Sequence, residues 1–237
     1  MMTRRDFVLS GCAQLLACAC LPSLAFAASA PTRGSRVGWA RLVTPNDWSR
    51  HRDNDPALVN FIRTQTSLNL DPVCEAAHPD RIDELCAYPL IFANWINDLS
   101  DKKQRANLRE YLARGGFLLV DACVNRDFVP DPDVWLRQTR ACLDEVAPGH
   151  EFRALPREHE IYTGLYALKN RPPHSYQGGE VDPRWEKHPT YGVFLNKRMV
   201  AIVSLNGIQC ATDSTSREVQ EDRMKLIVNI YVYAMTH

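Results

Sequence analysis

The feature that most constrains the fold is a four-residue apolar run at residues 117–120, which stands between two glycines and an aspartate. A short apolar run with such boundaries is typical of a strand buried on both faces of a parallel sheet. Gly115 and Gly116 also end the preceding amphipathic stretch, where a helix needs a residue in the left-handed conformation. The sequence therefore predicts a helix that leads directly into a central strand.

The same alternation of apolar runs and amphipathic stretches continues along the chain. Further strands are predicted at residues 37–43, 68–74 and 89–93, and an antiparallel hairpin at residues 191–196 and 199–205 with Lys197-Arg198 as its turn. Helices are predicted from Asp55-Pro56, at 79–87, after a Ser100 cap, at 133–146, and at 216–233 behind a Thr215/Glu218 capping box. This order predicts one α/β domain, over about residues 35–237, with three layers and a mostly parallel sheet.

A proline- and glycine-rich segment at about residues 163–190 interrupts this pattern. Loops of that length inside a compact domain are uncommon and are often functional. A lid over a site and a plain surface insertion are both consistent with its composition.

The first thirty residues are typical of an export signal. Thr3-Arg4-Arg5-Asp6-Phe7 resembles the bacterial twin-arginine signal, and Ala25-Phe26-Ala27 forms a cleavage site, with a cut after Ala30 as the alternative. We therefore expect residues 1–27 to be removed and the domain to be periplasmic. An uncleaved membrane anchor and lipidation, on Cys12 or more suitably on Cys18, remain open.

Composition excludes several classes of protein. Basic and acidic residues are equal in number, 28 each, and 45% of the residues are hydrophobic, which rules out disorder, a polybasic nucleic-acid tail and a multi-pass membrane protein. Membrane contact is expected only through the signal or a lipid on Cys18. Five cysteines remain after cleavage, an odd number, so at most two disulfides form.

Ligands of open parallel sheets bind beyond the carboxyl ends of the strands. Polar and aromatic residues follow three of the predicted strands there, and they are the candidate ligand-binding residues: Asp47, Trp48, Asn94, Trp95, Asp121 and Asn125, together with the thiol of Cys123. Ordinary loops carry similar residues, so this set alone does not specify a ligand.

Several segments occur in a fixed order: Asn54-Asp55-Pro56-Ala57-Leu58, Tyr88-Pro89-Leu90, residues 108–121, Leu155-Pro156 with His159-Glu160-Ile161-Tyr162, and residues 229–234. This series resembles domain-of-unknown-function family 4159 over nearly the whole chain after the signal. The resemblance implies a flavodoxin-like, class I glutamine amidotransferase-like fold without an established reaction. His159-Glu160 departs from the His-Pro pair that the family typically has there.

An amidotransferase-like fold has its nucleophile near the tip of a central strand, which makes Cys123 a candidate with His159 as base and Glu158 or Glu160 to orient the imidazole. No glycine flanks Cys123, as a nucleophile elbow requires, so a core or disulfide cysteine is the alternative. Asp121 is either a structural acceptor or a metal ligand, with partners among His159, His174 and His188.

Familiar dinucleotide, phosphate, serine-hydrolase and zinc motifs are missing from the sequence, as is a basic aromatic pattern for nucleic acid. The sequence therefore favours a non-catalytic domain that binds a small ligand or an envelope protein, and no cofactor is expected. The alternatives are a cell-envelope hydrolase that uses Cys123 and His159 or a metal at Asp121, and a redox protein with two cycling cysteines.

Overall fold

The computed structural model describes residues 37–46, 48–122, 129, 131–168, 187–213 and 216–237, except for the side chains of residues 211 and 213. In this part of the chain seven strands form one sheet in the order β2-β1-β3-β4-β7-β6-β5. The strands are β1 (Trp39–Leu42), β2 (Cys74–Ala77), β3 (Leu90–Ala93), β4 (Phe117–Asp121), β5 (Glu151–Ala154), β6 (Tyr191–Leu195) and β7 (Arg198–Ser204).

The first five strands of that order are parallel. β1 pairs with both β2 and β3, β3 pairs with β4, and β4 pairs with β7. Because β2 lies on one side of β1 and β3 on the other, the strand order reverses between β1 and β3, as in flavodoxin-like doubly wound sheets. The predicted α/β class and mostly parallel sheet are confirmed.

The remaining strands are antiparallel and extend the sheet beyond β7. Leu195 pairs with Arg198, so the turn of the predicted hairpin is Asn196-Lys197 and the predicted Lys197-Arg198 turn was wrong by one residue. Both turn residues have positive φ, 50° and 70°, as a two-residue primed turn requires. The neighbouring edge strand β5 was not predicted, because only one of its four residues is even partly buried.

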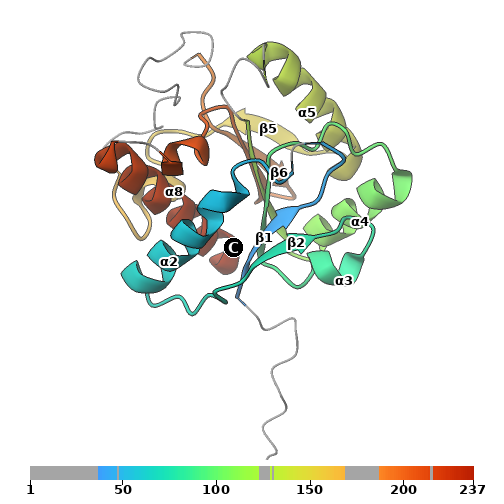
Figure 1. The fold of residues 1–237 in the computed structure, drawn as a ribbon. Coiled ribbons are helices and arrows are strands. Elements are labelled where there is room, and N and C mark those ends of the chain that lie inside the picture. The colour runs from blue at the N-terminus through green and yellow to red at the C-terminus, as the bar shows by residue number, and fades with distance from the viewer. Residues whose placement is uncertain (1–36, 47, 123–128, 130, 169–186, 214–215) are drawn as a thin grey trace, which may run out of the picture. The chain divides into compact units, whose positions relative to one another are not determined.

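Helices cover both faces of the sheet. Figure 1 shows α2 (Asp55–Gln65) and α8 (Arg217–Thr236) together on one face, and α3 (Ile82–Leu85), α4 (Lys102–Ala113) and α5 (Pro132–Val146) on the other. The short helix α6 (Glu160–Thr163) contacts α8. Each face has its own apolar cluster, in which Leu58 and Ile62 of α2 lie on one side and Leu108 and Leu112 of α4 on the other. Within the described residues, none of the helices combines the length and the apolarity that a bilayer span requires.

Local details differ from the sequence-based expectations where the predicted signals were weak. The second strand lies at Cys74–Ala77 rather than 68–74, since Asp71-Pro72 breaks the earlier run. Asp101, not Ser100, caps α4, because its carboxylate accepts the N–H groups of Lys103 and Gln104. For α8, Ser216 stands at the cap position without a side-chain cap bond, and Thr215 lies outside the described residues.

The junction between α4 and β4 matches its prediction. Gly115 has φ 102°, in the region that favours glycine. Gly116 has a different reason, because a Cβ there would lie 2.2 Å from the ring of Tyr111. That ring is buried, and its hydroxyl donates to the carbonyl of Phe117. The helix can therefore turn into the strand only with a residue that has no side chain at position 116.

Candidate functional site

A buried ion pair joins β1 to the start of α2. Nε of Arg41 lies 2.5 Å from Oδ2 of Asp55, and Nη2 lies 2.7 Å from Oδ1, while each side chain is only 1% exposed. Burial lowers the pKa of Arg41 and raises the pKa of Asp55, and the charge of the partner opposes each shift. The guanidinium also stacks over the ring of Phe92, 4.8 Å from its centroid.

The same guanidinium holds the connection between β1 and α2. Its Nη1 and Nη2 groups donate to the backbone carbonyls of Arg50 and His51, at 2.9 and 3.1 Å. The amide of Asn94, directly after β3, donates to the Arg50 carbonyl from the other side. His51 has φ 57°, a left-handed conformation that a non-glycine residue rarely adopts. The loop at the point where the strand order reverses is thus held in one conformation by buried donors.

Gln209 connects this loop to the ends of the central strands. Its side-chain amide donates to Oδ1 of Asp55 at 3.1 Å and to the carbonyl of His51 at 3.3 Å. Its backbone N–H donates to the carboxylate of Asp121, the last residue of β4. Arg223 of α8, 6% exposed, interacts electrostatically with Asp121, although burial still lowers the pKa of Arg223 to about 10. One polar cluster therefore spans β1, α2, β3, β4 and α8.

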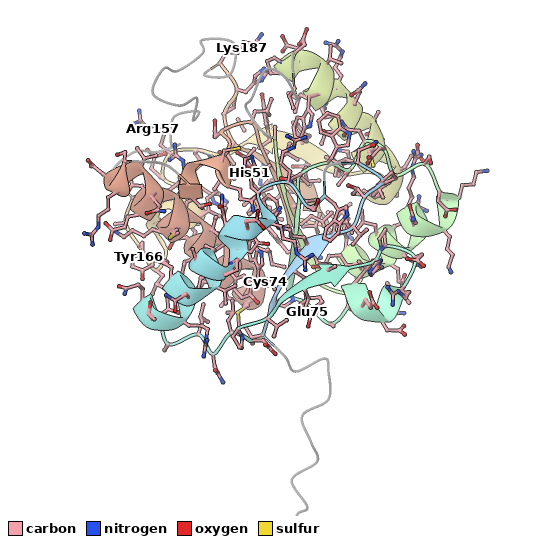
Figure 2. The ribbon with its side chains drawn as sticks, viewed as in Figure 1. His51, Cys74, Glu75, Arg157, Tyr166 and Lys187 are labelled. Atoms are coloured by element: carbon pink, nitrogen blue, oxygen red, sulfur yellow. The ribbon has the colours of Figure 1, made fainter. Side chains whose placement is uncertain are left out.

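Two reactive side chains meet at this cluster. Sγ of Cys210 lies 3.5 Å from Nε2 of His51, although 159 positions separate the two residues in the chain. Cys210 is 9% exposed and His51 is half-buried. Figure 2 labels His51 beside the start of α2. A thiol and an imidazole at this distance can share a proton.

The predicted ligand-binding residues have different environments. Asn94 and Asp121 belong to the polar cluster, and half-buried Trp48 lies on the same loop, 5.1 Å from the guanidinium of Arg52. The ring of Trp95 packs edge-on against Trp135, so that side chain contributes to the core. Asp47, Cys123 and Asn125 lie outside the described residues.

The structure does not bring His159 to Asp121. The imidazole of His159 caps α6 by accepting the N–H of Ile161, and it lies 5.7 Å from the ring of Tyr233. Tyr233 in turn contacts Phe117, the first residue of β4, whereas Asp121 is the last. Burial lowers the pKa of His159.

His188 does not complete a metal site among the described residues. Burial also lowers the pKa of His188, which lies 3.2 Å from Asp133. His174 is outside the described residues. Among the residues that the structure describes, no three histidine, cysteine, aspartate or glutamate side chains are grouped as a metal ion requires.

No disulfide joins the four described cysteines, Cys74, Cys86, Cys142 and Cys210. Burial raises the pKa of Cys74 and of Cys142 to about 11. Cys142 donates a hydrogen bond to the carbonyl of Ile96 within the core, as expected of a structural cysteine.

Two pockets in the described part of the chain are lined by none of Arg41, Asp55 and Gln209. One, of about 350 Å³, lies at the amino ends of the parallel strands. Its lining includes Val37, Pro89 and Gly116, which each precede a strand, and Met235 of α8. The other, of about 310 Å³, lies beside β2 and is lined by Glu75, by Arg81 and by Arg52 from the loop between β1 and α2. Figure 2 labels Glu75 on that strand.

Sequence reasoning missed most of the polar cluster: Arg41, His51, Gln209, Cys210 and Arg223 were not among the candidates. One signal was present, since Arg41 is a charged residue within an otherwise apolar strand. A charge at such a position needs a buried partner. Nothing local identified that partner as Asp55, or placed Cys210 beside His51.

The strand order defines a doubly wound α/β domain, and a buried polar cluster lies at the point where the strand order reverses. Residues 39–235 match the model of the family described as Domain of unknown function (DUF4159), and the chain belongs to that family. A search of curated proteins finds no match.

Proposed function

We propose that this domain binds a small polar ligand, or a polar segment of an envelope protein, at the carboxyl edge of its parallel strands. The proposal rests on the hydrogen bonds of the Arg41 guanidinium, which donates to the carboxylate of Asp55 and to the carbonyls of Arg50 and His51. The loop that it holds stands where doubly wound sheets accept their ligands.

The energetics of the cluster support binding rather than stability as its purpose. Removing two charges from water costs several kcal/mol for each ion, and well-packed apolar residues often serve stability equally well. A network that holds loop carbonyls in place reduces the ordering cost of binding, because the loop is already in one conformation. The polar lining of this edge favours a ligand with several hydrogen-bonding groups.

A cell-envelope hydrolase that uses Cys123 and His159 stays a prediction with less support. Cys123 lies outside the described residues, and His159 lies at the other end of β4 from Asp121. The same separation weakens the alternative of a metal held by Asp121 and His159.

The binding proposal is tested by thermal unfolding of the purified domain with amino acids, dicarboxylates and monosaccharides, followed by hydrogen exchange with each compound that raises the Tm. We expect protection at residues 44–54 and 205–213, and a smaller Tm shift in Trp48→Ala. Met235→Ala, at the pocket on the opposite edge, is the matched control. Protection around Met235 instead, or no shift with any compound, would contradict the proposal.

We also propose export by the twin-arginine route, on the basis of Arg4-Arg5 and the Ala25-Phe26-Ala27 site. The test is mass spectrometry of the protein from fractionated cells, for the wild type and for Arg4→Lys/Arg5→Lys. A periplasmic chain beginning at Ala28, and retention of the variant inside the cell, are expected. Equal export of both proteins would refute the twin-arginine route. A diacylglycerol adduct on Cys18 would show that the protein is lipidated there rather than cleaved after Ala27.

A further inference from the structure

We propose that Cys210 and His51 form a nucleophilic thiol site that accepts acyl groups from esters or thioesters. The geometry is that of an activated nucleophile, with Sγ of Cys210 3.5 Å from Nε2 of His51. This assignment goes beyond binding and does not depend on the identity of a ligand. It also differs from the pair expected from the sequence, because neither Cys123 nor His159 takes part.

Both members of the pair are held by buried anchors, and Gln209 contributes to each. The backbone of His51 is fixed through its carbonyl, which accepts from Arg41 at 3.1 Å and from Gln209 at 3.3 Å. Cys210 directly follows Gln209, whose backbone N–H is bonded to the carboxylate of Asp121 at 3.0 Å. Such support keeps a nucleophile and its base within reach of each other.

The left-handed backbone of His51 is held in place by the same buried donors. A non-glycine residue in this conformation costs of order 1–3 kcal/mol and persists only where its surroundings impose it. Here the surroundings are the buried donors of Arg41 and Gln209. The buried arginines near this loop each have an acidic partner: Arg41 pairs with Asp55, and Arg223 lies in the field of Asp121. His51 is the group assigned to take the thiol proton of Cys210, because its Nε2 lies 3.5 Å from Sγ.

The chemistry balances with these two side chains and water. Sγ attacks the acyl carbon, a carbon–sulfur bond forms, and the thiol proton passes to Nε2 of His51. When the tetrahedral intermediate collapses, the carbon–oxygen bond of an ester breaks and the proton goes to the leaving alcohol; a thioester releases its thiol in the same way. Water then attacks the acyl-cysteine with His51 as base, which releases the acid and restores the thiol.

The first test is the rate of iodoacetamide alkylation at each cysteine, followed by peptide mass spectrometry between pH 5.5 and 9. An ordinary thiol, with a reference pKa of about 8.5, is about 1% thiolate at pH 6.5. A thiol that is half ionised at this pH reacts about fivefold faster, after allowance for its lower intrinsic nucleophilicity. We expect this advantage for the Cys210 peptide over the half-buried Cys86 in the same sample.

His51→Asn is the informative variant, because asparagine tolerates a left-handed backbone and lacks an imidazole. We expect it to remove the fivefold advantage of Cys210 and to leave Cys86 unchanged. His78→Asn, at the end of a different strand, is the matched control and should alter neither rate. A Cys210 peptide that reacts no faster than Cys86, or equally fast in His51→Asn, would overturn the proposal.

The second test uses p-nitrophenyl acetate as the acyl donor. We expect a burst of p-nitrophenolate and an acetyl group on the Cys210 peptide, both absent from Cys210→Ser and slowed about fivefold in His51→Asn. An acetyl group on another residue, or a burst that persists in Cys210→Ser, would contradict the site. Since this probe needs no ligand of the domain, a failed ligand screen leaves the result intact.

Discussion

At the scale of single residues, the most unusual feature is a charge pair in the interior. Arg41 and Asp55 are each 1% exposed, and the donors of the guanidinium are distributed over a carboxylate and two carbonyls. Removing one partner leaves the other charged and buried, which is far costlier than replacing both with apolar groups. Substituting one partner, or both together, therefore shows how strongly the two charges are coupled in the folded protein.

Asp55→Leu should lower the free energy of unfolding by about 3–5 kcal/mol, because Arg41 is left buried without its counter-ion. The double variant Arg41→Met/Asp55→Leu should lose clearly less than the sum of the two single changes. Urea unfolding at pH 7 measures all three. The exposed pair Arg114–Glu110 is the control, and Glu110→Ala should leave stability unchanged within error. Additive losses at Arg41 and Asp55 would show that the two charges are not coupled.

At the scale of elements, local signals at helix ends and turns decide where each element begins. Asp101 rather than its neighbour Ser100 caps α4, and Asn196-Lys197 rather than Lys197-Arg198 turns the hairpin. Both differences amount to one residue. The cap can be tested by substitutions at Asp101 and at Ser100, and the turn by two substitutions at Lys197 with opposite expected effects.

Asp101→Ala should reduce the free energy of unfolding by about 1 kcal/mol, because the N–H groups of Lys103 and Gln104 lose their acceptor. Ser100→Ala is the matched control, and we expect a change within about 0.3 kcal/mol, as is usual for surface positions outside a cap. Chemical denaturation of both variants decides the cap. A larger loss in Ser100→Ala would restore the sequence-based assignment.

Lys197→Gly should stabilise the domain by about 0.5 kcal/mol. A residue with a side chain pays about 1–2 kcal/mol for the left-handed conformation, and glycine avoids this cost. The greater freedom of glycine in the unfolded chain cancels only part of the resulting stabilisation. Lys197→Val, with a branched Cβ at φ 70°, should destabilise it. Thermal unfolding measures both changes, and a gain in stability for valine would exclude this turn conformation.

At the scale of the whole molecule, polar groups are divided between the carboxyl ends and the amino ends of the parallel strands. The carboxyl edge holds the Arg41–Asp55 cluster, whereas His159 lies with Tyr233 near the start of β4. Burial lowers the pKa of His159 and of His188, so the folded protein resists protonation of both imidazoles. This resistance gives folding a pH dependence.

Below pH 6.5 the unfolded chain binds protons at these histidines more readily than the folded chain does, so the free energy of unfolding should fall as the pH is lowered from about 6.5. Protonation of Nδ1 would also remove the acceptor that caps α6. His159→Asn keeps a cap acceptor without titrating in this range, and its stability should depend less on pH between about 6.5 and 5.

Urea unfolding at a series of pH values measures the slope, with His78→Asn as the control. An unchanged slope in His159→Asn would show that this imidazole protonates as readily in the folded chain as in the unfolded one. A stability that rises on acidification would contradict the direction of both pKa shifts.

Much of the architecture could be predicted from the sequence, because its signals are local. The apolar run before Asp121, the glycines at 115 and 116, and the proline after Asp55 each act within a few residues. They predicted the strands β1, β3, β4, β6 and β7 and the helices α2, α4, α5 and α8 to within a few positions. The exposed edge strand β5 lacked such a signal and was missed.

The sequence by itself thus determined the order and type of most elements, and the edge of the sheet at which polar residues would gather. Only the tertiary structure decided which of those residues meet. Arg41 reaches Asp55 across 14 positions, and Cys210 reaches His51 across 159. Contacts of this kind follow from strand order and helix packing, which depend on the burial of the whole apolar surface rather than on any local pattern.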